Sequence, residues 1–161
     1  MSGVKLVVSD AHQGIRRALA RHFQGVTWQR CRVHFKREMG RKVSYKLMKE
    51  LMGDLSAVYA WRERVECLGR GAEMAQQWKG RCAAVSSMLE EGLEDTLAVL
   101  SFPEHHRRKL ASTNMVESVM KRLKKRTRVV GIFPNRASCD RLIGANCWNC
   151  TRNGTWRRKD T

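Results

Sequence analysis

Two carboxylates stand where the sequence changes from one kind of element to another. Asp10 follows a short β-branched apolar run, and Glu117 lies three residues after Asn114, where an amphipathic helix is predicted to begin. A carboxylate at the carboxyl end of a strand in an open α/β sheet is typical of a ligand or metal site. Both positions also match a helix capping box, Asp10 with Gln13 and Asn114 with Glu117. On local sequence alone the cap is the favoured interpretation of Asp10, and both interpretations of Glu117 stay open.

A basic run begins one helical turn after Glu117. It reads KRLKKRTR from Lys121 to Arg128, and no acidic residue occurs between Glu117 and Asp140. A carboxylate beside cations on one helix suits phosphodiester chemistry, with a metal at one end and a phosphate backbone along the face. The structural alternative is a solvated helix C-terminus, where cations are also favoured.

Cysteine and histidine occur in two short elements of metal-ligand spacing. Cys31 and His34 form C-x-x-H, and Cys147 and Cys150 form C-x-x-C. Together the two elements could supply the four side-chain ligands of a tetrahedral zinc site. Because the two elements are far apart in sequence and lie in different local contexts, zinc is not expected. A thiol–imidazole nucleophile needs a third group to orient the imidazole, and none is apparent nearby.

The elements that must position these residues follow from apolar periodicity. The apolar run Val4–Ser9 predicts a buried strand, residues 12–23 predict an amphipathic helix, and residues 26–30 predict a second strand. Three apolar stripes at helical spacing follow between residues 47 and 97. Residues 105–109 are expected to form an exposed basic turn.

The C-terminal third is predicted to hold two more helices. The first has an expected buried face of Val116, Val119, Met120 and Leu123. Residues 129–133 predict a short strand, and Pro134-Asn135 opens the last helix. After about Leu142 the apolar pattern decays into what is expected to be a frayed basic tail.

Composition narrows the class of protein. The chain has 161 residues, with 32 Lys and Arg against 15 Asp and Glu, a formal net charge of +17, and 42% hydrophobic residues. Ordinary apolar content argues against a disordered chain. No run approaches a membrane span or the core of a signal peptide, so an intracellular protein is expected. The charge predicts a nucleic-acid partner, and the alternatives are a solubilising surface and a surface that binds anionic membranes.

Three blocks taken together resemble the mutator-family DDE transposases of bacterial insertion sequences. They read VVSDAHQGIRRAL from Val7, WQRCRVHF from Trp28, and STNMVESVMKRLKKRTRVVGIFPN from Ser112. The resemblance covers nearly the whole chain up to about Leu142.

The resemblance implies an α/β fold, mostly α by residue count: a partial RNase H-like core interrupted by a helical insertion. Residues 1–40 would form the second half of the core, with the strand of Asp10 and the C-x-x-H segment. Residues 41–104 would form the insertion, 105–145 the catalytic-glutamate helix and the end of the core, and 146–161 the basic tail.

The resemblance also implies a function. Asp10 matches the family's second catalytic aspartate and Glu117 its catalytic glutamate, and both would bind Mg²⁺ or Mn²⁺ for DNA strand cleavage and transfer. Cys31 and His34 match a family signature of open role. The expected partners are the terminal inverted repeats of a transposon and target DNA. The protein is expected to form a homo-oligomer, to bind no membrane, and to lie in the bacterial cytoplasm, associated with the nucleoid. The residues predicted to bind DNA are Arg16, Arg17, Lys121, Arg122, Lys124, Lys125, Arg126 and Arg128.

One departure from the family bears on activity. The family's first catalytic aspartate lies on an earlier strand, and no residue before Val7 matches it. The resemblance therefore implies a truncated transposase that is inactive alone. The alternative is a non-enzymatic basic DNA-binding protein stabilised by zinc.

Overall fold

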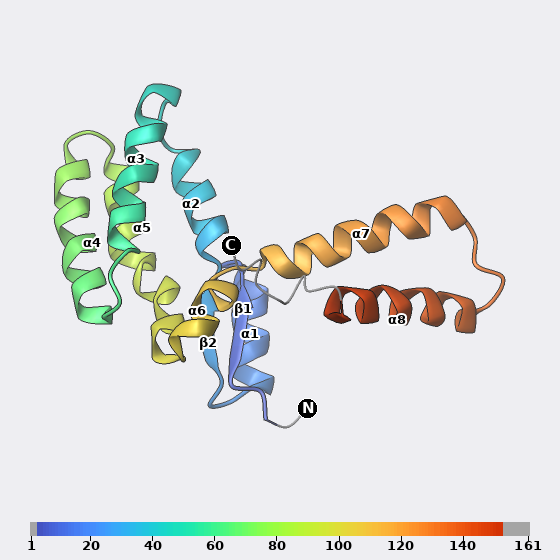
Figure 1. Ribbon diagram of the computed structural model, residues 1–161. Coiled ribbons are helices and arrows are strands. Elements are labelled where there is room, and N and C mark those ends of the chain that lie inside the picture. Colours follow the sequence, from blue (N-terminus) through green and yellow to red (C-terminus); the bar gives the residue numbers. More distant parts are fainter. Residues whose placement is uncertain (1–2, 153–161) are drawn as a thin grey trace. The chain divides into compact units, whose positions relative to one another are not determined.

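The computed structural model describes residues 3–152, which form two compact units. Of the described residues, those up to Thr113 belong to unit 1 and those from Asn114 onward belong to unit 2. Each unit is described below by itself (Figure 1).

Unit 1 begins with a parallel β-α-β arrangement. Strand β1 (Leu6–Ser9) is followed by helix α1 (Gln13–His22) and strand β2 (Thr27–Arg30). The strands pair in parallel from Leu6 opposite Thr27 to Ser9 opposite Arg30, so their carboxyl ends meet at one edge. In Figure 1 the two strands lie side by side with α1 alongside them.

The rest of unit 1 is helical. Its elements are α2 (Arg32–Gly40), α3 (Tyr45–Val58), α4 (Arg64–Lys79), α5 (Ala83–Gly92), the 3₁₀ turns η1 (Glu94–Thr96) and η2 (Ala98–Ser101), and α6 (Glu104–Leu110). The apolar faces of these helices share one core, whose largest fully buried side chains include Trp78, Phe35, Leu51 and Leu97. The indole N–H of Trp78 donates to Asp54 (2.9 Å), so its polar atom is satisfied inside the core.

One buried amide joins the sheet to this helical block. The Nε2 of Gln29 donates to the carbonyl of Thr96 (2.7 Å) and to that of Arg30 (2.8 Å). Its Oε1 accepts from the backbone N–H of Val99 (2.7 Å), and the residue is fully buried. Because the partners are backbone groups of η1 and η2, Gln29 fixes β2 against both 3₁₀ turns.

The described part of unit 2 contains two helices that pack against each other. They are α7 (Asn114–Val130) and α8 (Arg136–Arg152). Helix α7 ends at Val130 and is followed by Gly131, whose φ of +71° is a conformation that L side chains rarely adopt. Before α8, the side-chain oxygen of Asn135 accepts from the backbone N–H of Ser138 (2.9 Å), as a helix cap does.

The α/β class with mostly helical content is confirmed, and so are both strands of unit 1. Four local expectations are wrong. Residues 105–109 lie in α6 rather than in a turn, and residues 129–130 continue α7 rather than starting a strand. Helix α8 continues to Arg152, although the apolar pattern fades near Leu142. On α7 the predicted face is exposed at Val116 and Met120.

Candidate functional site

Asp10 and Cys31 lie at the same edge of the sheet, where its two parallel strands end. Asp10 follows Ser9 at the end of β1, and Cys31 follows Arg30 at the end of β2. The backbone N–H of Cys31 donates to the carbonyl of Ser9 (2.7 Å), which extends the ladder by one bond. Both sequence-predicted segments of unit 1 therefore end at the same edge.

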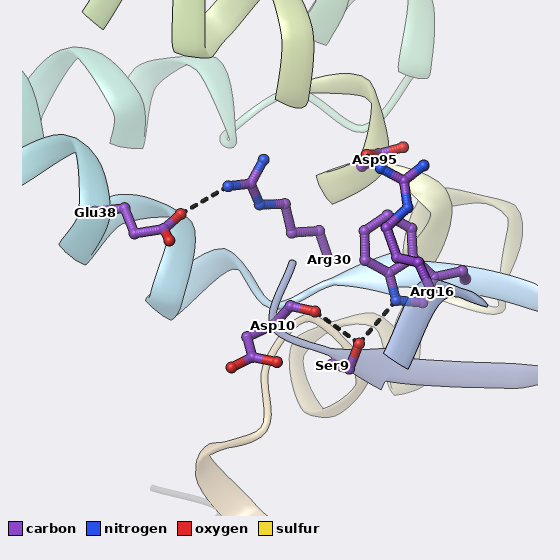
Figure 2. Close-up of polar contacts among 7 residues, drawn as sticks. Ser9, Asp10, Arg16, Arg30, Glu38 and Asp95 are labelled. Carbon is purple, nitrogen blue, oxygen red and sulfur yellow. Dashed lines mark hydrogen bonds and ion pairs between the residues drawn. The ribbon is translucent and has the colours of Figure 1, made fainter. Parts of the chain in front are cut away.

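Asp10 is held by its main chain and presents its side chain to solvent. The Ser9 hydroxyl donates to the Asp10 carbonyl (2.8 Å), and the residue is exposed. Among the described residues, nothing donates to the Asp10 carboxylate (Figure 2). The capping interpretation is wrong, because the N-cap of α1 is His12, whose Nδ1 accepts from the Gly14 N–H (3.2 Å).

Two arginines near this edge are neutralised by other carboxylates. Arg30 forms an ion pair with Glu38 (2.7 Å), and its side chain is only 15% exposed. Arg16 stacks over the Trp28 ring at 4.6 Å and lies 3.8 Å from Asp95. Figure 2 shows both pairs directed away from the Asp10 carboxylate. Within residues 3–152, Asp10 is thus left without a cation of its own.

The same Trp28 orders the end of β1. Its indole N–H donates to the Ser9 hydroxyl (2.9 Å), and that hydroxyl in turn donates to the Asp10 carbonyl. This short chain of hydrogen bonds fixes the backbone from which the carboxylate projects.

The C-x-x-H element forms a partly buried polar cluster, around the buried Cys31, with a residue that the sequence does not single out. His34 Nδ1 lies 3.2 Å from Cys31 Sγ, as expected for residues one helical turn apart. Thr113, 82 positions from Cys31, places its hydroxyl 3.4 Å from the same sulfur, and its backbone N–H also donates to that sulfur at 3.4 Å. We name Cys31, His34 and Thr113 the thiol cluster.

The thiol cluster changes the acidity of its cysteine. Burial raises the pKa of Cys31, but hydrogen bonds from the Thr113 hydroxyl, from the backbone of His34 and Thr113, and from the His34 ring outweigh burial. The net effect lowers the pKa below 9.0, since these donors stabilise the thiolate. Cys31 itself has no exposed surface, so the sulfur cannot meet a substrate.

In unit 2, Glu117 lies in the first turn of α7. A helix capped by Asn114 would begin at the next residue, Met115. Helix α7 begins at Asn114 itself, so Asn114 is not its N-cap. Glu117 lines a shallow groove on α7 together with side chains three, four, seven, eight and eleven positions later: Met120, Lys121, Lys124, Lys125 and Arg128. These spacings place them on one helical face.

The predicted DNA-binding residues divide accordingly. Four of them, Lys121, Lys124, Lys125 and Arg128, share the groove with Glu117, and we name them the groove cations. Arg122 and Arg126 belong to the same helix but do not line that groove. In unit 1, Arg16 and Arg17 are exposed on α1, and Arg16 also contacts Asp95.

The candidate metal ligands do not form a complete set within the described residues. No group of three or more His, Cys, Asp or Glu side chains there could hold a metal ion. Cys147 is exposed on α8, and the side chain of Cys150 lies outside the described part of the structure. Asp10 belongs to unit 1 and Glu117 to unit 2. Within the described range, no helix has the length and apolar character needed to cross a membrane.

Comparison with known proteins gives a consistent family. The family described as "Transposase, Mutator family" matches residues 1–157. The chain is 37% identical over 145 residues to the transposase for insertion sequence element ISRM5 of Rhizobium meliloti. It is 32% identical over 151 residues to the IS256 transposase in transposon Tn4001 of Staphylococcus aureus. Each match covers 90% of this chain but only 36% and 37% of those relatives, so the chain spans just over a third of their length.

Proposed function

The chain belongs to the Mutator family of transposases, and we propose that it supplies part of that family's catalytic core for cutting and joining DNA. The observation that carries the proposal is the Asp10 carboxylate, exposed at the carboxyl edge of a parallel sheet and unpartnered among the described residues. An unpaired carboxylate at that edge is suited to a cation from outside the chain.

The fold that we propose is an RNase H-like core of the DDE class, interrupted by the helices of residues 41–104. Its support is the parallel β-α-β arrangement, with a carboxylate directly after the first strand. The neighbouring strand ends in the C-x-x-H segment, and a helical block follows before the helix of Glu117.

We further propose that Asp10 and Glu117 hold Mg²⁺ or Mn²⁺. Both are hard oxygen donors, which these cations prefer over thiol or imidazole ligands. When bound, the metal activates a nucleophilic oxygen and stabilises a leaving one at phosphorus. Two ligands do not complete an octahedral site, so the remaining positions would be taken by water, by DNA or by a further carboxylate.

The role proposed for this chain's cations is to hold the phosphate backbone. The groove cations continue along α7 from Glu117, so a strand bound along that face would lead toward the carboxylate. The partners that we propose are the terminal inverted repeats of a transposon and target DNA. Such a protein would work at the bacterial nucleoid. It would act as a homo-oligomer, because a transposon has two ends.

A metal titration tests the ligand pair. We expect Mn²⁺, followed by electron paramagnetic resonance, to bind the chain, and Asp10→Asn and Glu117→Gln each to weaken binding by about tenfold or more, since each removes one charged ligand. Asp140→Asn is the matched control, because Asp140 is an exposed carboxylate on α8 whose partner is Arg136. Binding that neither substitution changes would reject the ligand pair. Retained DNA binding in that case would favour the non-enzymatic alternative.

A further inference from the structure

A chain of two hydrogen bonds runs from β2 to the residue that carries the proposed metal ligand (Figure 2). The indole N–H of Trp28 donates to the Ser9 hydroxyl (2.9 Å), and that hydroxyl donates to the Asp10 carbonyl (2.8 Å). Ser9 is buried, whereas Asp10 is exposed. All three residues belong to unit 1. The two bonds therefore connect an exposed carboxylate residue to the interior of the same unit.

Trp28 decides which way the Ser9 hydroxyl points. An indole N–H can only donate, so the Ser9 oxygen must be the acceptor of that bond. The hydroxyl proton is then directed to the other partner of Ser9, the Asp10 carbonyl. Without the indole N–H, the hydroxyl would be free to rotate away from that carbonyl. The bond from Ser9 to Asp10 therefore depends on Trp28.

The bond from Ser9 restricts the backbone of Asp10. It closes a ring of atoms that includes the N–Cα and Cα–C bonds of Asp10, so both φ and ψ of that residue are limited. The direction of the Cα–Cβ bond, and with it the origin of the carboxylate, follows from these two angles. Asp10 itself lies outside both β1 and α1, so neither element imposes its regular angles there.

Trp28 is itself held on two sides. The guanidinium carbon of Arg16 lies 4.6 Å from the centroid of the Trp28 ring, and Arg16 is 3.8 Å from Asp95. The next residue of β2, Gln29, is fixed by buried hydrogen bonds to η1 and η2. Because its ring is covered and its backbone is tied to the helical block, the indole is a fixed donor for Ser9.

We propose that Ser9 and Trp28 are positioning residues, which order the backbone of Asp10 before a divalent cation binds. This inference rests on the proposed function, in which Asp10 is a metal ligand. A carboxylate on an ordered backbone loses less conformational freedom on binding, so it binds the cation more tightly than one on a free loop. Neither positioning side chain is a ligand, because the Ser9 oxygen is engaged by Trp28 and the indole N–H has no acceptor atom.

The test is the affinity of the full chain for Mn²⁺, followed by electron paramagnetic resonance. Ser9→Ala removes the hydroxyl, and Trp28→Phe removes the N–H but keeps an aromatic ring beneath Arg16. We expect each to weaken Mn²⁺ binding about fivefold, the lower end of the cost of ordering one residue's backbone. The double variant should also lose about fivefold rather than about 25-fold, since both changes break one chain of bonds. Ser9→Thr keeps the hydroxyl and should restore the affinity.

Two matched controls lie elsewhere in unit 1. The Ser56 hydroxyl also donates to a main-chain carbonyl, that of Met52 (2.6 Å), and accepts from the Lys36 amine (3.3 Å). Trp61 also lies beneath an arginine, Arg70, at 5.5 Å. Ser56→Ala and Trp61→Phe should leave Mn²⁺ affinity unchanged. Losses in these controls equal to those in Ser9→Ala and Trp28→Phe would overturn the inference.

A second comparison separates positioning from general stability. In the Asp10→Asn background, neither Ser9→Ala nor Trp28→Phe should weaken Mn²⁺ binding further, because no carboxylate is left to position. A repeat of the full loss in that background would overturn the inference while leaving the metal site standing, and so would wild-type affinity in the single variants. If Asp10→Asn alone leaves Mn²⁺ affinity unchanged, the proposed function fails and this inference falls with it.

The two positioning variants also decide independently of each other. Circular dichroism shows whether each one folds. If Trp28→Phe does not fold, Ser9→Ala still gives the answer, because it has its own control in Ser56→Ala, its own rescue in Ser9→Thr and its own comparison with Asp10→Asn. Trp28→Phe, with Trp61→Phe as its control, does the same if Ser9→Ala does not fold.

Discussion

The groove cations of α7 give the sharpest test of the proposed DNA contact. Two pairs of cations on the helix have the same spacing and differ in whether they line the groove. Lys121 and Lys125 line it, whereas Arg122 and Arg126 do not. Replacing either pair with glutamine removes two positive charges that lie four residues apart, so the two double variants have equal net charge.

The magnitude follows from counterion release. If each groove cation contacts one phosphate of duplex DNA, its loss makes the negative slope of log K against log salt shallower by about 0.9, so loss of the groove pair should make it shallower by about 1.8. Between 50 and 200 mM salt, a slope change of about 1.8 alters the affinity ratio of wild type to variant by roughly 12-fold. The off-groove pair should change the slope by well under half as much.

The measurement is fluorescence anisotropy with a labelled duplex of arbitrary sequence at four or more salt concentrations. Arbitrary sequence suffices, because phosphate contacts carry no base information. Equal slope changes in the two double variants would refute the assignment of the groove, and would mean that α7 binds DNA only through its total charge. No slope change in either would place the DNA contacts elsewhere on the chain.

Three further predictions concern stability and titration. Gln29→Leu should lower the free energy of unfolding in urea by about 3 kcal/mol, since it leaves the buried Val99 N–H without its acceptor and removes two donated bonds; a loss below about 1 kcal/mol would contradict the linking role. Burial raises the pKa of Tyr59 to about 12 against the opposing effect of its hydrogen bond to Thr96, so the phenolate absorbance that Tyr59→Phe removes should develop near pH 12. Because the folded pKa of Tyr59 is raised from 10.0, the free energy of unfolding should fall as pH rises from 10 to 12, by up to about 2.7 kcal/mol, and Tyr59→Phe should abolish that fall; a Tyr59 phenolate that forms near pH 10 would contradict it. Asp10→Asn should change stability by less than about 0.5 kcal/mol in urea, because the carboxylate caps no helix and pairs with no described cation; a loss near 1 kcal/mol would indicate a structural role.

Local patterning predicts much of the fold. The strands of unit 1 and the stripes of α3, α4 and α5 are readable because apolar residues recur at the period of the element that buries them. Helix α2 is missed because charged residues surround its two buried side chains, Phe35 and Met39. At the end of α7 the β-branched pair Val129-Val130 reads as a strand, but the pair is exposed and simply continues the helix until Gly131.

The sequence predicts those residues of the candidate site that directly follow a predicted strand. Asp10 and the C-x-x-H element stand directly after predicted strands, so their placement at one edge follows from parallel pairing. Thr113 carries no such signal, because a threonine before a helix is ordinary and its partner lies 82 residues away. A contact between residues so far apart in sequence depends on how the intervening helices pack. A short stretch of sequence carries no information about that packing.

The distribution of charge decides between a solubilising surface and a binding surface. Residues 41–104, most of the helical block, hold 9 Lys and Arg against 10 Asp and Glu, so this part is close to neutral. Residues 1–40 hold 8 against 2, and residues 105–161 hold 15 against 3, so the whole excess of +17 belongs to the segments that carry Asp10 and Glu117. A charge that served only solubility would have no reason to avoid the helical block, whose surface cations are largely matched by its own carboxylates. Under the proposed function, DNA would bind the two basic segments that carry Asp10 and Glu117, and a divalent cation would offset the repulsion between these carboxylates and the phosphates. The DNA-binding and Mn²⁺ measurements test these two parts of the proposal separately.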